Sequence, residues 1–238
     1  SHVEEAKKNG LRCGVEIKPE QTKPEETYKV ASGTGFYISK LGHLITNHHV
    51  IDGCERVKAH RKGVAQEATT IAVDKLNDLA LLKVKTPASY IFPISKENPY
   101  PLQEIIVAGF PFGDAISSSI KFTQGIVSSM SGIGDNYSQI QIDAAIQPGN
   151  SGGPIVDELG NVIAVAVSKL DMKAVLEDFG VIPENTNFGV KASAVLNLLD
   201  GNNVSPVRIN TKPISKGDLS RNVTEGTTHL SCWMTMAQ

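Results

Sequence analysis

A serine stands between glycines in the stretch Gly149-Asn150-Ser151-Gly152-Gly153. Glycines on both sides indicate a tight, exposed turn, which can present the hydroxyl together with neighbouring backbone N–H groups. Acyl transfer needs this combination, a nucleophile beside donors for the developing oxyanion. The stretch could also be a plain glycine-rich turn with a structural serine. A serine nucleophile would, in addition, need a base from elsewhere in the chain.

A candidate base lies in the stretch Thr46-Asn47-His48-His49-Val50. In an extended strand the two histidines would point to opposite faces, so only one of them can face a given cleft. Asp78 precedes an apolar run and could fix the tautomer of that base, although taken alone it is an ordinary turn residue before a strand. The order His, Asp, Ser is that of the chymotrypsin template.

The same serine also matches the G-x-S-x-G elbow of α/β-hydrolases. That fold needs a helix after the serine and its base histidine later in the chain. Here Pro154 and two β-rich runs follow, and the only later histidine is His229. This class is therefore disfavoured.

A metal site is a further alternative, because His and Cys are the usual zinc ligands. Its residues would be His43, His48, His49, Cys54 and His60. Their spacing fits neither the H-E-x-x-H helix nor a zinc finger. We therefore expect no metal and no other cofactor.

Composition describes an ordinary globular chain of 238 residues with 23 basic and 25 acidic side chains. This near-neutral balance gives no argument for a nucleic acid or a membrane surface as partner. No apolar run approaches the roughly 20 residues that span a bilayer, and no signal peptide is visible at the N-terminus. Of the three cysteines, Cys13, Cys54 and Cys232, we favour three buried thiols, with one disulfide plus a free thiol left open.

Short β-rich runs bounded by turn residues follow one another from Lys29 onward, which favours an all-β sandwich or barrel. The runs are Gly35–Ser39, His43–Thr46, Arg56–Ala59, Ala68–Val73, Leu79–Val84, Glu104–Gly109, Lys121–Met130, Gln139–Ile142, Pro154–Val156, Val162–Ser168 and Phe188–Val190.

Helices are expected at two places. One short helix is predicted over Val3–Asn9, before an exposed connector at residues 18–27. The other covers Ala194–Leu199, with Ser193 as N-cap and Gly201 closing it. The polar residues 201–228 are interpreted as a tail, and residues 228–236 as a last strand or helix.

Several ordered motifs over residues 30–200 together resemble the protease domain of the HtrA/Deg family. They are Gly33-Thr34-Gly35-Phe36, Thr46-Asn47-His48-His49-Val50, Asp78-Leu79-Ala80-Leu81-Leu82, Gly109-Phe110-Pro111-Phe112-Gly113, Gln124-Gly125-Ile126-Val127-Ser128, Gln141-Ile142-Asp143-Ala144-Ala145-Ile146, Gly149-Asn150-Ser151-Gly152-Gly153 and Asn187-Phe188-Gly189-Val190.

The resemblance implies a trypsin-like fold of two packed six-stranded antiparallel β-barrels, with the active site between them and a C-terminal helix. The domain organisation then becomes an N-terminal helix and connector at residues 1–28, a protease domain at 29–200, split near 100–120, and a tail at 201–238.

The resemblance also assigns roles in a serine endopeptidase. His49 would be the general base and acid, Asp78 would orient it, and Ser151 would be the nucleophile. The oxyanion hole would be formed around Gly149, Asn150 and Ser151, with the N–H groups of Gly149 and Ser151 as donors.

The specificity pocket would involve Ala145, Ile146, Val167 and Ser168. No acid lies among them, so we expect cleavage after small or medium apolar residues. Digestive relatives carry an Asp directly before the serine to pair with a freed N-terminal amine. Asn150 is uncharged, so we expect no activating cleavage. Ordering of the segments 111–120, 131–138 and 169–187 would replace it.

Unfolded or damaged polypeptides in a bacterial periplasm, or outside the cell, are the implied substrates. The chain departs from the family in lacking room for a PDZ module after Gly201 and an aromatic cluster near its N-terminus, so the family's trimer stays uncertain. A catalytically silent binding module with the same fold remains the alternative.

Overall fold

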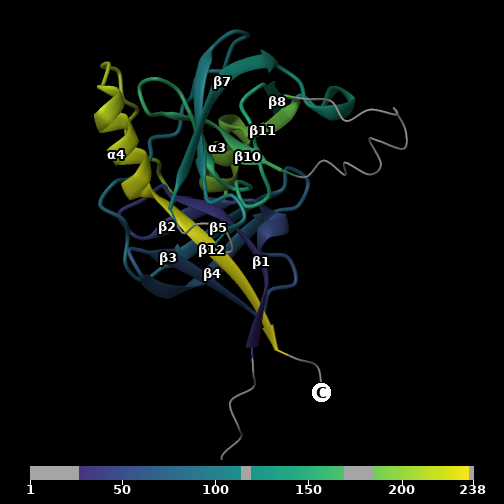
Figure 1. Cartoon of the computed structure of the whole chain (residues 1–238), viewed down its shortest axis with the longest axis vertical. Coiled ribbons are helices and arrows are strands. Elements are labelled where there is room, and N and C mark those ends of the chain that lie inside the picture. The colour runs from purple at the N-terminus through teal and green to yellow at the C-terminus, as the bar shows by residue number, and fades with distance from the viewer. Residues whose placement is uncertain (1–26, 114–118, 169–184, 236–238) are drawn as a thin grey trace, which may run out of the picture.

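The computed structural model describes residues 27–113, 119–168 and 185–235, and within them the chain forms two closed antiparallel β-barrels. The barrels lie one above the other in Figure 1. Around the first barrel the order is β1 (Thr27–Tyr37), β12 (Thr227–Thr235), β3 (Arg56–Arg61), β4 (Val64–Asp74), β5 (Leu79–Val84) and β2 (His43–Thr46). Around the second it is β10 (Val162–Val167), β11 (Asn187–Lys191), β8 (Gln139–Ile142), β7 (Lys121–Ser129), β6 (Glu104–Gly109) and β9 (Pro154–Val156). The expected pair of six-stranded barrels is confirmed.

Turns with left-handed backbone join the strands where the sequence places glycine. Lys62 and Gly63, both with positive φ, form the two-residue hairpin between β3 and β4, a turn whose twist suits flanking strands. Gly42, with φ of 85°, turns the chain between β1 and β2, and a Cβ there would collide with the carbonyl oxygen of Val84. No other residue fits this position without displacing β5.

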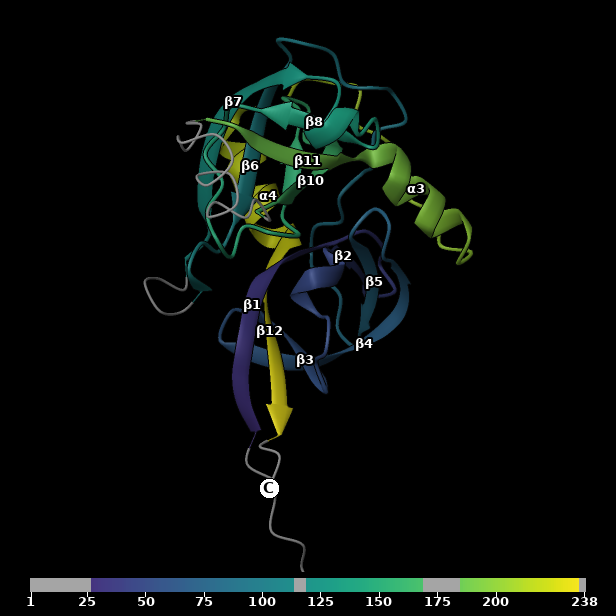
Figure 2. The same ribbon diagram turned by 90° about the vertical axis from the view of Figure 1, so that its right-hand side faces the viewer.

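Of the two alternatives left open for residues 228–236, the strand is confirmed as β12, whereas the polar residues 201–228 are not only a tail, since they contain a helix at 216–226. In both Figure 1 and Figure 2, β12 runs beside β1, and it pairs with β3 on its other edge. Its polar sequence hides this burial: Thr228 is fully buried, and its hydroxyl donates to the carbonyl of His60 at 2.8 Å. The boundary predicted at residue 200 therefore does not coincide with the end of the barrels.

Two α-helices flank these strands in the described part of the chain. Helix α3 (Ala192–Asp200) confirms the helix predicted before Gly201, but its N-cap is Lys191 and not Ser193. Helix α4 (Lys216–Gly226) begins at Ser215, whose hydroxyl accepts a hydrogen bond from the Asp218 amide, and it leads directly into β12. The helix predicted over Val3–Asn9 lies outside the described residues.

The preferred interpretation of three buried thiols is wrong, and the alternative with one disulfide holds for the two cysteines that the structure describes. Cys54 and Cys232 form a disulfide, with their Cα atoms 5.3 Å apart. It ties β12 to the loop after β2, across a sequence separation of 178 residues. Cys13 lies outside the described residues.

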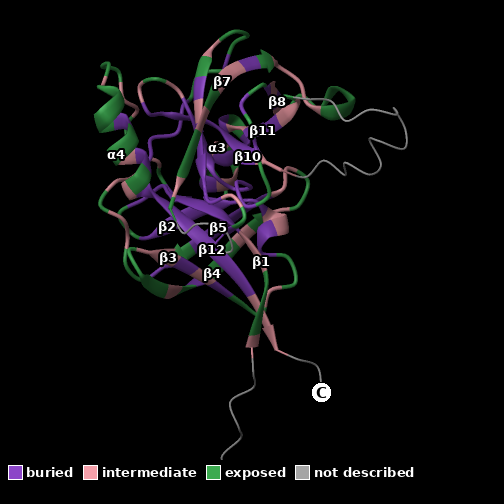
Figure 3. Cartoon of the chain, in the orientation of Figure 1, coloured by how far each residue is buried: buried purple, intermediate pink, exposed green. Residues whose placement is uncertain are grey.

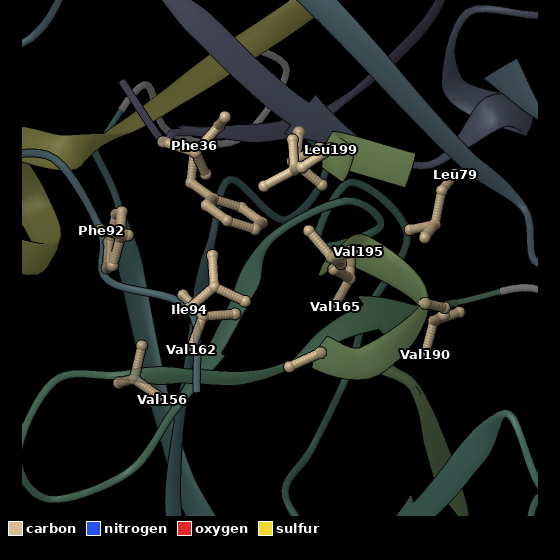
Figure 4. Close-up of a cluster of buried hydrophobic side chains, with 14 of the residues drawn as sticks. Phe36, Leu79, Phe92, Ile94, Val156, Val162, Val165, Val190, Val195 and Leu199 are labelled. Atoms are coloured by element: carbon tan, nitrogen blue, oxygen red, sulfur yellow. The ribbon is translucent and has the colours of Figure 1, made fainter. Parts of the chain in front are cut away.

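Buried residues, drawn purple in Figure 3, occur along the strands of both barrels. The core between the barrels takes Phe36 from the first barrel, Val165 from the second and Val195 from α3 (Figure 4). Phe36 packs edge-on against Phe92 of the connecting segment, with ring centroids 5.5 Å apart. Because interiors pack at crystal-like density, this shared core fixes one barrel against the other, and with it any site between them.

Candidate active site

His49 and Asp78 meet at one end of the first barrel. The Nδ1 atom of His49 lies 2.6 Å from Oδ2 of Asp78, and its backbone N–H donates to Oδ1 at 2.9 Å. The two side chains are only 24% and 17% exposed. A carboxylate in this position makes Nδ1 the protonated ring nitrogen, so Nε2 is left as the basic atom.

Local backbone geometry aims this pair. His49 lies in a 3₁₀ turn, His48–Val50, and not in an extended strand. The two histidines therefore do not alternate across a strand, as the sequence analysis expected of an extended segment. His48 instead turns toward Asp52, with its Nε2 atom 3.6 Å from Oδ1. Of the two imidazole rings, that of His49 contacts the Asp78 carboxylate.

Asp78 has a φ of 55°, a left-handed conformation that is uncommon outside glycine. Its carbonyl oxygen accepts hydrogen bonds from Nδ2 of Asn47 at 2.9 Å and from the His48 amide at 3.1 Å. The turn before it is held by Asp74, whose carboxylate accepts from the backbone and side-chain amides of Asn77. Sequence reasoning missed Asn47 and Asp74, because only the contacts reveal what they hold.

Ser151 belongs to the second half of the chain but lies against the first barrel. Its carbonyl oxygen accepts a hydrogen bond from the Thr34 amide on β1 at 2.9 Å. A Cβ on Gly152 would come within 2.9 Å of the Asn47 amide, two residues before His49. The structure thus brings all three predicted catalytic residues to the junction of the barrels.

The Ser151 hydroxyl contacts the residue that follows β10. Its Oγ accepts a hydrogen bond from the Ser168 amide at 3.1 Å. Among the hydrogen bonds of the described residues, none joins this Oγ to His49. Because Oγ is the acceptor in the bond with Ser168, the Ser151 O–H can still act as a donor.

The residues before Ser151 form a loop, 147–151, that we call the oxyanion loop. The Pro148 carbonyl accepts a hydrogen bond from the Phe112 amide at 2.7 Å. Because a trans peptide is planar, the Gly149 N–H points the opposite way from that carbonyl. The Asn150 amide is already committed to the Gln147 carbonyl at 2.9 Å. The Asn150 amide is thus used within the loop, and the Gly149 and Ser151 amides remain the predicted donors.

Thr34 fixes this loop and was also missed. Its hydroxyl donates to the Gly149 carbonyl at 2.7 Å and accepts from the Phe110 amide at 3.0 Å. The side chain is fully buried. A hydroxyl between Gly33 and Gly35 in an otherwise apolar run is the signal that could have found it.

The four predicted specificity residues lie at different depths. Ile146 is buried in the core of the second barrel, whereas Ala145 is exposed. Val167 and Ser168 are half-buried at the end of β10. Asn150 is 4% exposed, and its Oδ1 atom has no hydrogen-bond partner among the described residues.

The metal alternative receives no support from these positions. The five residues considered for it are all described, and no group of three His, Cys, Asp or Glu among the described residues could hold an ion together. Cys54 is taken by its disulfide.

In the described ranges, no helix is long and apolar enough to cross a membrane.

The fold and the site together define a class. The model of the trypsin-like peptidase domain matches residues 33–165, and the chain belongs to this family of serine proteases. Within it, the chain is similar to proteins of the HtrA and DegP type. It is 36% identical to a probable periplasmic serine endoprotease, DegP-like, of Marinomonas, over 61% of this chain and 31% of the relative.

Other relatives and structures agree. A Sinorhizobium fredii protein, y4bJ, is 39% identical over 88% of this chain and 33% of its own length. The chain thus spans about a third of these curated relatives. A serine endoprotease from Yersinia pestis matches 74% of this chain and 61% of its own, with 26% identity and a TM-score of 0.60. The HtrA-type protease AlgW matches 71% and 51%, with 27% identity and a TM-score of 0.58.

Proposed function

We propose that this chain is the catalytic unit of a serine endopeptidase. The observation that carries the proposal is the hold of Asp78 on both the ring and the backbone of His49, beside a loop that presents Ser151. A carboxylate–imidazole pair and a serine hydroxyl at the same junction form an arrangement suited to nucleophilic acyl transfer. Titration with a serine-directed phosphonate, followed by mass spectrometry of the labelled peptide, tests it.

The proposed reaction is a two-step acyl transfer that uses Ser151, His49 and Asp78. Ser151 Oγ attacks the scissile carbonyl while its proton passes to Nε2 of His49. The Gly149 and Ser151 amides stabilise the oxyanion. The protonated His49 then donates to the leaving amine, which departs and leaves an acyl ester on Ser151. Water, deprotonated by His49, cleaves this ester and restores the enzyme. Asp78 stabilises the imidazolium throughout.

Activation needs no cleavage of the chain in this proposal. Asn150 carries no charge for a freed amine to pair with, and the oxyanion loop is held by Thr34 and Phe112 instead. A chain that begins at Thr27 should therefore fold and keep its activity. If it folds but is inactive, the cleavage-independent model is wrong.

The preference for the P1 side chain is proposed from the absence of an acidic residue among the predicted pocket residues. Neither Ala145 nor Ile146 can pair with a basic P1 side chain, and a buried cation without a partner is costly. We expect cleavage after Val, Ala or Ile in a peptide library. A strong preference for Arg or Lys would contradict this assignment.

The natural substrates are proposed to be unfolded polypeptides in a bacterial periplasm or outside the cell. Two observations support this: the relatives of DegP type are named periplasmic endoproteases, and Cys54–Cys232 is a disulfide, which persists in oxidising compartments. Unfolded casein should be degraded faster than folded globular proteins of similar size. Equal rates on folded proteins would count against it.

A silent binding module is the second candidate. The observation that favours it is that, among the hydrogen bonds of the described residues, Ser151 Oγ accepts one from the Ser168 amide and none joins it to His49. Phosphonate labelling separates the two, since a silent module would not react, even with unfolded protein present.

A further inference from the structure

A cavity of about 530 Å³ lies apart from the candidate catalytic residues, since none of His49, Asp78 and Ser151 lines it. Its walls come from β3, β12, the end of α4 and the segment around Phe110. The lining includes His60, Arg61, Lys62, Phe110, Glu225 and His229. Figure 1 shows how α4 runs into β12 at this side of the first barrel. The volume is that of a site for a small organic molecule.

The charge in this cavity is positive. Arg61 lines it, and the Nη1 atom of Arg61 is buried without a hydrogen-bond partner among the described residues. The carboxylate on the wall, that of Glu225, contacts Lys62 at 2.7 Å and the Ser89 hydroxyl at 2.6 Å, and the charge of Arg61 acts on it without a hydrogen bond from Nη1. A buried guanidinium N–H without an acceptor is costly, so an anionic acceptor from outside would be favoured there.

The rest of the wall is largely ring surface. The His60 and His229 rings have centroids 5.1 Å apart, and Phe110 meets His229 edge-on at 5.8 Å. Ile120 adds an aliphatic side chain. Such surfaces gain from burying an apolar group and offer little to a bare, hydrated ion such as phosphate.

We propose that this cavity binds a carboxylate carried on an apolar body, with Arg61 as its counter-ion and Phe110 against its apolar part. Two sources share this chemistry: a free apolar carboxylic acid and the C-terminal residue of a peptide.

The cavity is also connected to the oxyanion loop. Phe110 donates its amide to Thr34, and Phe112 donates its amide to the Pro148 carbonyl. Gly113 lies so close to His229 that a Cβ there would be 3.2 Å from Nε2. A ligand packed on Phe110 would therefore favour the arrangement that orients the Gly149 N–H, and should raise the rate of acyl transfer. This coupling rests on the proposed function, whereas binding does not.

Binding is tested first, on the Ser151→Ala variant, with sodium 4-phenylbutyrate as the probe. Trp233, the chain's single tryptophan, reports on the cavity, since its Nε1 donates to Ser231 Oγ, which lies 2.6 Å from Nε2 of His60. We expect a saturable change in tryptophan fluorescence, confirmed by calorimetry. The neutral 4-phenylbutyramide should bind about tenfold more weakly or worse, the loss expected for a hydrogen bond to a charged group. Equal binding of acid and amide, or no binding of either, would overturn the proposal.

The matched variants are Arg61→Gln and Arg56→Gln. Both residues lie on β3, but Arg56 pairs with Glu67 on the exposed surface and does not line the cavity. Arg61→Gln should abolish the preference for the acid, and Arg56→Gln should keep it. If Arg56→Gln removes the preference as well, the assignment to this cavity is wrong.

Two further experiments identify the source of the carboxylate and test the coupling to the oxyanion loop. In the first, the probe is a tetrapeptide ending in Phe, with either a free or an amidated C-terminus. Binding of the free form alone identifies peptide C-termini as ligands, and binding of phenylbutyrate alone identifies small acids. With active enzyme, either ligand should raise kcat severalfold. Binding without a change in kcat would overturn the coupling. An enzyme inactive with and without ligand would instead contradict the proposed function.

Discussion

Asp78 contacts His49 twice, with one carboxylate oxygen on the ring and the other on the backbone amide. Asp78→Asn would keep the size of the side chain but could donate to Nδ1, which would place the ring proton on Nε2, the wrong atom for a base. We expect kcat to fall on the order of 10³- to 10⁴-fold, as for the corresponding change in the chymotrypsin template, with folding little affected. Steady-state kinetics at pH 8 and circular dichroism measure this. A loss of less than about tenfold would show that Asp78 does not orient the base.

Thr34 connects β1, the oxyanion loop and Phe110 through one buried hydroxyl. Thr34→Val removes that hydroxyl and leaves the Gly149 carbonyl and the Phe110 amide without this partner. We expect a loss of stability of about 1–3 kcal/mol and a fall in kcat of about 10- to 100-fold, with KM changed less. Thr34→Ser retains the hydroxyl and should recover most of kcat. If Ser and Val behave alike, the hydroxyl is not what positions the loop.

The disulfide joins Cys54, five residues after His49, to Cys232 on β12. Removing it frees the unfolded chain from a long closed loop, so Cys232→Ser should lower the free energy of unfolding by about 2–5 kcal/mol. Denaturant unfolding with and without reductant measures this for the wild type, and Cys13→Ser is the control. A wild type equally stable in reductant would argue against the bond.

His43 is buried on β2, with its Nδ1 atom 2.7 Å from the Ser39 hydroxyl. Burial, and to a smaller extent the charge of Lys83, lowers the pKa of His43. The folded state then binds fewer protons than the unfolded state, so stability is full above the ordinary value of about 6.5 and falls as the pH drops below it. His43→Gln should show a shallower loss of stability between pH 7.5 and 5.5. Identical slopes would mean that His43 does not titrate abnormally.

The sequence predicted the strands that carry a strong apolar pattern, such as β5 and β10, because burial of both faces leaves little alternative. At β12 it left strand and helix open and did not predict a place in the barrel, because Thr228, His229 and Ser231 are buried with polar contacts that no apolar pattern reveals. Polar residues enter a barrel only if partners far along the chain satisfy them, and those partners are visible only after folding.

The site divides in the same way. His49, Asp78 and Ser151 were identifiable because their chemistry is distinctive, and the structure brings them to one junction. Thr34, Asn47 and Asp74 were not, since hydroxyl and amide side chains occur everywhere and only their hydrogen bonds distinguish them. The choice of His49 over His48 came from the resemblance, and the structure adds that the 3₁₀ turn at His48–Val50 leaves the ring of His49 in contact with Asp78.

The most direct test of the central claim is hydrolysis of unfolded casein by the wild type beside Ser151→Ala, both purified in the same way. Ser151→Ala also removes the acceptor of the Ser168 amide, so circular dichroism of both proteins must agree before the difference is assigned to chemistry. We expect the wild type to cleave casein and the variant to lose at least about 10³-fold of that rate. Equal cleavage by both proteins would contradict it, because the peptide bond would then be broken without Ser151.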